Sequence, residues 1–165
     1  MKAKSAEATI RHPSHSSSVG ASSKLPKTMR AVAIDRFGGP EVLTLHTLQV
    51  PALSEHEVLI GVDTAGVGVW DAEIRDGTLD PSAKKRFPLV LGTAGSGVIA
   101  ELGSRVRRFK VGDKVYSYAY DNPKGGFYAE YVAVSSDRVR TYRSCLTWST
   151  PARFLLLALP RCRCR

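Results

Sequence analysis

The clearest β pattern of the chain is Gly95-Ser-Gly-Val-Ile-Ala-Glu-Leu-Gly-Ser-Arg-Val-Arg-Arg-Phe-Lys-Val-Gly-Asp-Lys-Val-Tyr-Ser-Tyr118. It predicts two strands, over residues 95–102 and 114–118, because Gly103 and Gly112-Asp113 supply turn chemistry between them. We expect Phe109 and Val111, just before the second turn, to fill the core. Short strands joined by glycine-rich turns are typical of a compact antiparallel barrel or sandwich.

The same pattern continues on both sides of this stretch. Turn residues at 37–40 and 124–126 separate further strands, which we expect over residues 29–34, 42–50, 57–64 and 127–134. The first two of these strands form a predicted hairpin. A brief helical turn follows Trp70-Asp71 and ends at Gly77, and residues 78–88 form a predicted loop. No predicted helix is long enough for a crossover between parallel strands, so the sequence predicts a mainly β fold.

The positive charge of the chain is confined to its two ends. The net charge is +9, but residues 29–137 hold 12 basic and 14 acidic residues. Residues 1–28 hold five basic residues and one acidic residue, and residues 138–165 hold seven arginines and no acidic residue. A nucleic-acid surface gathers Lys and Arg on one folded face, so we expect no nucleic-acid partner. No apolar run approaches the roughly 18 residues that span a bilayer, and we expect no membrane partner.

The two ends also differ in composition from the rest of the chain. Residues 1–28 include seven serines and few apolar residues, so they predict a disordered leader. A start at Met29 and an organelle transit peptide are the alternatives. Residues 140–165 hold all three cysteines, Cys145, Cys162 and Cys164. So few cysteines exclude a disulfide scaffold and favour a reducing, cytoplasmic location.

Several spacings go beyond generic β patterning. They are Met29-Arg-Ala-Val…Phe37-Gly-Gly-Pro-Glu-Val-Leu43, Glu57-Val-Leu-Ile60, Ala65-Gly-Val…Asp71, Pro88-Leu-Val-Leu-Gly92…Gly95-Ser-Gly-Val98, Phe109-Lys-Val-Gly-Asp-Lys-Val115 and Gly125-Gly-Phe-Tyr-Ala-Glu-Tyr-Val132. In this order they resemble the GroES-like N-terminal domain of medium-chain dehydrogenases/reductases, and most of all that of the zinc-independent quinone oxidoreductases. The resemblance covers residues 29–139. It implies a partly open barrel with short helices, while the Rossmann domain of that family is absent from this sequence.

Three glycines in this pattern, Gly92, Gly95 and Gly97, permit a positive φ or a close approach of two backbones. Their spacing, G-x-x-G-x-G, is not the dinucleotide fingerprint G-x-G-x-x-G, and no helix follows that would hold a pyrophosphate. Gly66 and Gly68 match only a fragment of that fingerprint. The resemblance implies NADPH as the cofactor of the full-length family, and we expect most of its site to be absent here.

The resemblance also implies where an active cleft would lie. Zinc-dependent relatives have a Cys where this chain has Gly68 and a His-Glu pair where it has residues 93–94, and no Cys occurs in residues 1–144. We therefore expect no zinc. Gly68, Trp70, Asp71 and Thr93 would line the cleft beside the nicotinamide. Trp70 is either a cleft residue or a packed aromatic side chain, and Asp71 either caps the short helix or contacts a ligand.

The likeness stops within two residues of Val139. When residues 140–163 are back-translated with suitable synonymous codons and read from each third base, they give HLSQLPDLEHAGAVPATGLTALQ. This string resembles the family's continuation into an Ala-rich helix. We therefore expect residues 140–165 to be an out-of-frame tail.

This resemblance implies that the chain is one part of an enzyme. We expect the catalytic-domain half of an NADPH-dependent quinone or enone oxidoreductase, which works by hydride transfer, truncated and inactive by itself. A small-molecule quinone or enone is the expected partner, and the family is often dimeric through the domain that this sequence lacks. A non-catalytic GroES-like binding module and a zinc-independent alcohol or aldehyde reductase fragment remain the alternatives.

Overall fold

The N-terminal part of the fold is a small sheet built on a hairpin. The computed structural model of the protein describes residues 25–79 and 87–142. Strand β1 (Thr28–Ile34) pairs antiparallel with β2 (Thr44–Gln49), and β4 (Leu89–Val90) joins the other edge of β1. The predicted hairpin is confirmed, but its second strand begins at Thr44 instead of residue 42. The reason is that Pro40–Val42 forms a 3₁₀ turn that buries Val42.

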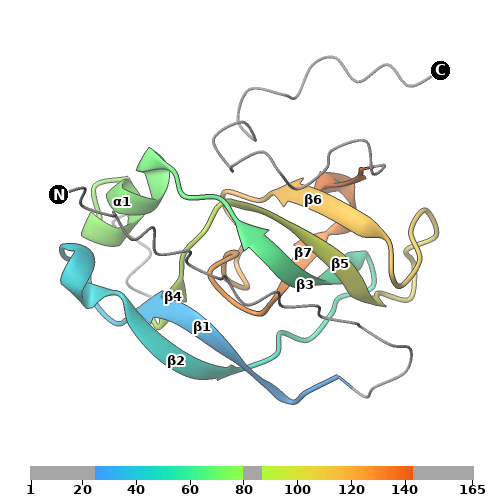
Figure 1. The fold of residues 1–165 in the computed structure, drawn as a ribbon, viewed down its shortest axis with the longest axis horizontal. Coiled ribbons are helices and arrows are strands. Elements are labelled where there is room, and N and C mark those ends of the chain that lie inside the picture. Colours follow the sequence, from blue (N-terminus) through green and yellow to red (C-terminus); the bar gives the residue numbers. More distant parts are fainter. Residues whose placement is uncertain (1–24, 80–86, 143–165) are drawn as a thin grey trace, which may run out of the picture.

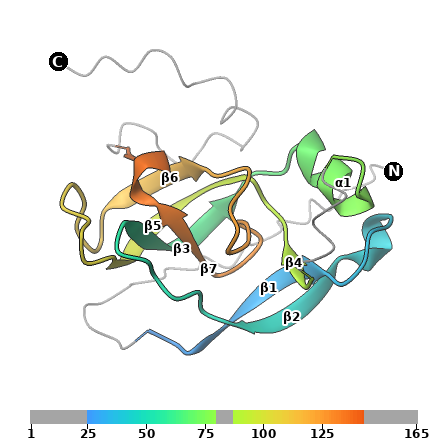
Figure 2. The same cartoon turned by 180° about the vertical axis from the view of Figure 1, so that it is seen from behind.

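The second sheet has five strands and curls into a partly open barrel (Figures 1 and 2). Its order is β7-β3-β5-β6-β8, and all its pairs are antiparallel. The bounds are β3 Glu57–Ala65, β5 Ala94–Leu102, β6 Lys114–Tyr118, β7 Tyr131–Ser135 and β8 Val139–Thr141. Only the 3₁₀ turn Ser136–Arg138 separates β7 from β8. Because these two edge strands are joined so tightly, the sheet must curl to bring its edges together, as expected for a mainly β, partly open barrel.

The core lies inside this curled sheet. Alternate side chains of the strands point inward, as a period of two requires, and the fully buried ones are Val58, Ile60, Ile99, Val115, Val132, Val134 and Val139. Phe109 packs against them as predicted, whereas the expectation for Val111 is wrong, because its side chain is 62% exposed. Lys110 N donates to Asp113 Oδ2 at 3.0 Å. Residues 110–113 therefore form a tight turn that turns Val111 outward.

Close backbone approach at the central strand pair explains one of the predicted glycines. On β5, a Cβ at Gly97 would collide with the carbonyl oxygen of Gly61 on β3. Gly92 has the positive φ that the sequence predicted as the alternative, since its φ is +97°. Both positions therefore require glycine, for different reasons.

Other expectations for the chain need correction. The strand predicted over residues 127–134 begins only at Tyr131, because Phe127 and Tyr128 bond instead to the turn at residues 91–92. Strands β4 and β8 were not predicted. The leader 1–28 and the tail 140–165 lie mostly outside the described residues, and so does most of the loop 78–88. Among the described residues, no helix has the length and apolar character needed to cross a membrane.

Candidate functional site

Strand pairing brings two of the predicted site segments to the same end of the sheet. Ala65 at the end of β3 lies opposite Gly95 at the start of β5. The chain that leaves β3 and the chain that enters β5 are therefore neighbours, and Gly66 N donates to Ala94 O at 2.9 Å. The first segment leads into helix α1 (Val69–Asp76), which lies at this end of the sheet (Figure 1). The second contains Gly92 and Thr93.

Asp71 joins these two segments. Its Oδ2 accepts a hydrogen bond from Gly68 N at 2.8 Å, and its Oδ1 accepts one from Gly92 N at 3.1 Å. The predicted helix cap is thus confirmed, with Gly68 at the N-cap and Asp71 three positions on. The side chain is only 4% exposed. One buried carboxylate therefore fixes both the start of α1 and the turn before Thr93.

Tyr128 lies beside this carboxylate. Burial, the charge of Asp71 and a side-chain hydrogen bond to Asp71 together raise the pKa of Tyr128 to about 12. Tyr128 N also donates to Leu91 O at 2.9 Å, and Phe127 N donates to Gly92 O at 2.9 Å. The turn at Gly92 is therefore held from two sides, by Asp71 and by residues 127–128.

A pocket of about 380 Å³ opens beside this turn. It is lined by three parts of the chain: Ile74 of α1 with Leu79, residues 89–93, and residues 119–122 with Gly126. Thr93 is 6% exposed, and its carbonyl oxygen accepts a hydrogen bond from Ala119 N at 2.8 Å. The pocket lining is therefore mixed: apolar side chains such as Ile74, Leu79 and Leu91 stand beside hydrogen-bonding residues, namely Thr93, Tyr120, Asp121 and Asn122. A ligand that has both an apolar part and a polar group would match such a lining.

Trp70 lies near this site but outside the pocket. A Cβ at Gly68 would come to 3.2 Å from Trp70 Cδ1, so the indole packs against the backbone of Gly68. Trp70 is 41% exposed, and its neighbours Val67 and Val69 are 82% and 68% exposed. The structure therefore brings Gly68, Asp71 and Thr93 together and leaves Trp70 at the surface. Its part in a cleft stays a prediction.

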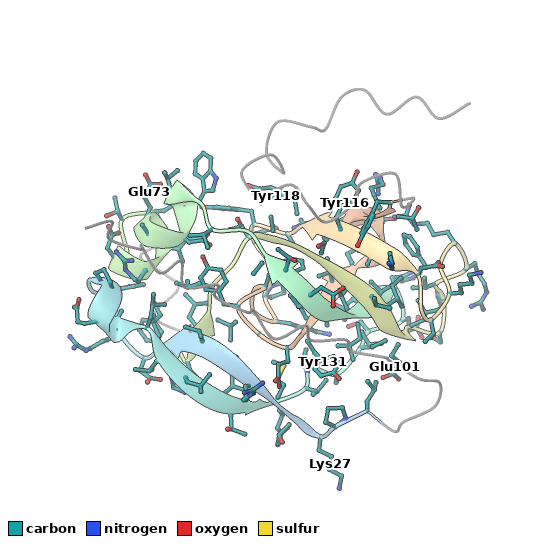
Figure 3. All side chains as sticks on the ribbon, in the orientation of Figure 1. Lys27, Glu73, Glu101, Tyr116, Tyr118 and Tyr131 are labelled. Carbon is teal, nitrogen blue, oxygen red and sulfur yellow. The ribbon has the colours of Figure 1, made fainter. Side chains whose placement is uncertain are left out.

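Of the predicted site residues only Thr93 lines the pocket, while Gly68 and Asp71 lie behind the turn and do not line it. Residues 119–122 are among the lining residues that the sequence did not predict. They follow β6, whose Tyr118 lies on the same upper side of the molecule as Glu73 of α1 in Figure 3. The sequence signal was a Tyr-Asp-Asn-Pro turn before Lys124-Gly-Gly126, but turn chemistry alone does not say what a turn faces. Its place opposite α1 depends on the pairing of β5 with β6.

The donor set of the described residues does not fit a metal ion. Within residues 25–79 and 87–142, no three His, Cys, Asp or Glu side chains are grouped so as to hold one. Gly68 has no side chain to offer, and Asp71 already accepts two backbone hydrogen bonds. Zinc sites need three or four side-chain donors around one point.

The described residues do not fit the phosphates of a dinucleotide either. In dinucleotide-binding folds the pyrophosphate lies on the free N–H groups of a helix N-terminus, and the only helix longer than one turn in the described part of the chain is α1. At the start of α1, Gly68 N is already bonded to the Asp71 carboxylate. The negative charge of this carboxylate would also repel a phosphate.

Comparison with known proteins gives the family. The alcohol dehydrogenase GroES-like domain family matches residues 54–143. The chain belongs to this family. As a GroES-like domain, it is related to the quinone oxidoreductases of the medium-chain dehydrogenase/reductase superfamily, as the sequence predicted.

Two relatives and one solved structure illustrate the likeness. The quinone oxidoreductase of Lama guanicoe is 41% identical over 114 residues, which are 68% of this chain and 33% of that protein. The "NADPH-dependent alkenal/one oxidoreductase, chloroplastic" of Arabidopsis thaliana is 37% identical over 122 residues, 70% of this chain and 31% of that protein. The structure of the quinone oxidoreductase of Coxiella burnetii matches with a TM-score of 0.69 and 34% identity, over 73% of this chain and 39% of that one. This GroES-like chain thus spans about a third of the length of its curated relatives.

Proposed function

We propose that this domain forms the substrate-binding side of an NADPH-dependent reductase that acts on a quinone or an enone. The observation that carries the proposal is the pocket lined by both apolar and polar residues from α1, from residues 119–122 and from the turn that Asp71 fixes. A planar conjugated carbonyl compound matches such a lining, because its ring or alkene is apolar and its oxygen needs only one or two hydrogen-bond donors. The names of the related enzymes, a quinone oxidoreductase and an alkenal/one oxidoreductase, support the same substrate class.

In this proposal the domain positions the substrate and does little chemistry itself. NADPH, when bound, supplies the hydride. The apolar side chains of the lining would contact the ring or alkene of the carbonyl compound, and the turn at Gly92 and Thr93, which Asp71 holds, would fix where the compound lies. Because the described residues offer no free helix N-terminus for the phosphates, the cofactor would be held mainly by a dinucleotide-binding domain outside them.

We also propose that the domain works without zinc and that the 165-residue chain alone does not turn over substrate. The first part is supported by the donor set, since Gly68 and Thr93 stand where zinc-dependent relatives have Cys and His. The second is supported by the missing phosphate site. The cytoplasm remains the proposed location.

The test is a titration of the ¹⁵N-labelled 165-residue chain with 1,4-naphthoquinone, followed by NMR. We expect saturable shifts in the amide signals of Thr93 and residues 119–122. Leu79→Trp, which fills the pocket mouth, should weaken binding, while the matched control Leu45→Trp should not, because Leu45 is 70% exposed on β2 and does not line the pocket. Shifts confined to other regions would contradict the proposed substrate site.

A second assay tests the dependence on another domain. Purified chain is mixed with NADPH and 1,4-naphthoquinone, and the absorbance of NADPH is followed. We expect no consumption above that of a protein-free control. Turnover by the purified chain would contradict the proposal that it is inactive alone.

A further inference from the structure

One wall of the pocket is a connecting segment that must be held in place by side chains. We call residues 119–126, between β6 and the segment leading to β7, the pocket wall. Its backbone bonds are few and long at its turn: Asn122 N donates to Ala119 O at 3.4 Å, and Gly125 N donates to Asn122 O at 3.3 Å. Bonds of this length are at the weak end of the range. The two ends of the wall are held by shorter backbone bonds, from Ala119 N to Thr93 O at 2.8 Å and from Gly126 N to Val90 O at 2.9 Å. The middle of the wall therefore depends on side-chain contacts, one of which is the ion pair between Arg138 and Asp121.

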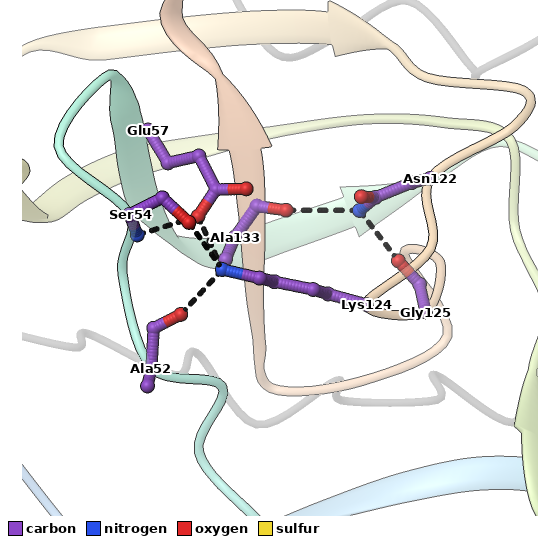
Figure 4. A network of polar contacts seen from close by, with 7 residues as sticks. All are labelled: Ala52, Ser54, Glu57, Asn122, Lys124, Gly125 and Ala133. Carbon is purple, nitrogen blue, oxygen red and sulfur yellow. Dashed lines mark hydrogen bonds and ion pairs between the residues drawn. The ribbon is translucent and has the colours of Figure 1, made fainter.

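Lys124 supplies the most extensive of these contacts (Figure 4). Its Nζ donates to Ala52 O at 2.7 Å and to Ser54 Oγ at 3.1 Å, and it forms an ion pair with Glu57 Oε2 at 2.5 Å. An ammonium group has three N–H donors, so this side chain is fully satisfied. It links the pocket wall to the loop before β3 and to the first residue of β3.

Asn122 fastens the same turn to a second strand. Its Nδ2 donates to Gly125 O at 2.7 Å, within the turn, and to Ala133 O at 2.9 Å, on β7. Figure 4 shows Lys124 and Asn122 reaching from one turn to different neighbours. Pro123 stands between them and fixes its own φ. Lys124 and Asn122 therefore hold the same turn at two points, and Asn122 also lines the pocket.

The ion pair is well placed to hold a fixed geometry. The side chains of Lys124 and Glu57 are 29% and 16% exposed, so water screens them less than it screens a surface pair. Burial opposes ionisation of Glu57. The hydrogen bonds from Lys124 and Ser54 and the charge of Lys124 outweigh this effect and hold the pKa of Glu57 below its usual value. Glu57 also accepts a hydrogen bond from Ser54 N at 2.7 Å, which orients the carboxylate toward Lys124.

We propose that Lys124, paired with Glu57, is a positioning residue that sets the affinity of the pocket for its carbonyl ligand. It touches no ligand itself, and it acts by fixing Asn122 and the rest of the pocket wall opposite α1. This inference rests on the proposed function for the identity of the ligand, but the placement of the wall does not depend on any ligand.

The experiment compares three variants of the full 165-residue chain. Lys124→Met removes the charge and all three hydrogen bonds but keeps the apolar stem, and Lys124→Arg restores a charged donor. Arg105→Met is the matched control: Arg105 Nε pairs with Glu55 Oε2 at 2.8 Å in the same loop before β3, but neither residue touches the pocket wall, and both are more than half exposed.

Two readouts separate placement from binding. Without ligand, we expect Lys124→Met to shift the amide signals of residues 119–122, Lys124→Arg to shift them less, and Arg105→Met to leave them unchanged. With 1,4-naphthoquinone, we expect Lys124→Met to raise Kd about fivefold to tenfold, with partial recovery in Lys124→Arg. Unchanged signals of Leu59 and Ile60 in the core would show that each variant is folded. If Lys124→Met does not fold, the isosteric Glu57→Gln takes its place.

The outcomes distinguish this inference from the proposed function. Wild-type-like amide signals and Kd in the Lys124→Met chain would overturn the positioning role. If the wild-type chain binds no naphthoquinone, the proposed function fails and the affinity part of the inference fails with it. The placement of the wall then stands or falls with the ligand-free spectra alone.

Discussion

Replacement of Asp71 by Ala tests whether one buried carboxylate holds the site together. The substitution removes the acceptor for two backbone N–H groups, those of Gly68 and Gly92. The side chain of Asp71 is only 4% exposed, so water cannot replace it without entering the site. We expect the chain to fold but to lose stability, with the loss centred on the junction of α1 and the turn at Gly92.

The magnitude follows from the two lost backbone hydrogen bonds; the side-chain hydrogen bond of Tyr128 is lost as well, which makes the resulting figure a lower bound. Loss of a helix N-terminal cap costs about 1 kcal/mol. A buried N–H left without a partner costs a further 1–3 kcal/mol or so, and the bond to Gly92 is the buried one of the pair. We therefore expect Asp71→Ala to lower the free energy of unfolding by about 3 kcal/mol. Asp71→Asn should lower the free energy of unfolding by less than Asp71→Ala does. The amide oxygen of Asn can still accept a hydrogen bond from one N–H, while its NH₂ group faces the other.

The assay is urea denaturation of the purified chain, with hydrogen exchange as the local readout. The control is Asp76→Ala in the last turn of α1, where Asp76 Oδ1 accepts a hydrogen bond from Thr78 N at 2.8 Å at the surface. Asp76→Ala should lower the free energy of unfolding far less than Asp71→Ala, and it should leave the hydrogen exchange of the Gly92 amide unchanged. If Asp71→Ala costs no more than the control, or if the Gly92 amide stays protected, the carboxylate does not hold the two segments together.

Four further predictions test the fold, the chemistry and the coding frame. Gly97→Ala should lower the free energy of unfolding by about 3 kcal/mol, since its Cβ meets the Gly61 carbonyl. Gly61→Ala in the same ladder should cost much less, because its nearest contact would be 3.7 Å; equal losses in urea denaturation would contradict the close approach. The pKa of Tyr128 is raised from 10.0 to about 12. The neutral phenol therefore contributes its full share to the free energy of unfolding below pH 10, and this share is lost as the pH rises through 12. Wild type should therefore lose stability more steeply over that range than Tyr128→Phe, and parallel curves would argue against this role. Elemental analysis after dialysis against zinc should find no stoichiometric zinc, and one bound ion per chain would contradict zinc independence. In the DNA, the alternative frame near codon 140 should stay open beyond codon 165, and an early stop there would refute the predicted out-of-frame tail.

The sequence predicted the longer elements because their signals are local. Alternation over β3 and β5, turn residues at Gly112-Asp113 and the helix end at Gly77 are all visible within a few residues, and the structure has them. The strands β4 and β8 have two and three residues, which is too short for a period of two to be recognised. Val111 was misplaced for a related reason: its apolar character suggested the core, but the turn that exposes it is set by the hydrogen bonds of its neighbours.

The candidate site shows the same division between local and long-range signals. The helix cap by Asp71 could be read from the sequence, because Gly68 is only three residues away. Gly68 and Thr93 were indicated by resemblance, through positions that hold zinc ligands in other members of the superfamily. Residues 119–122 carried no comparable signal, since only the pairing of β5 with β6 places them opposite α1.

The sequence by itself determined the fold class, the positions of the turns and the family, since each depends on residue type and spacing along the chain. Only the tertiary structure decided which groups meet. Asp71 bonds to Gly92, 21 residues away, and Lys124 pairs with Glu57, 67 residues away. Such contacts depend on strand register, and a shift of one residue in register would turn every side chain of a strand to the other face. The pocket therefore depends on the strand register, which local sequence patterns limit but do not determine.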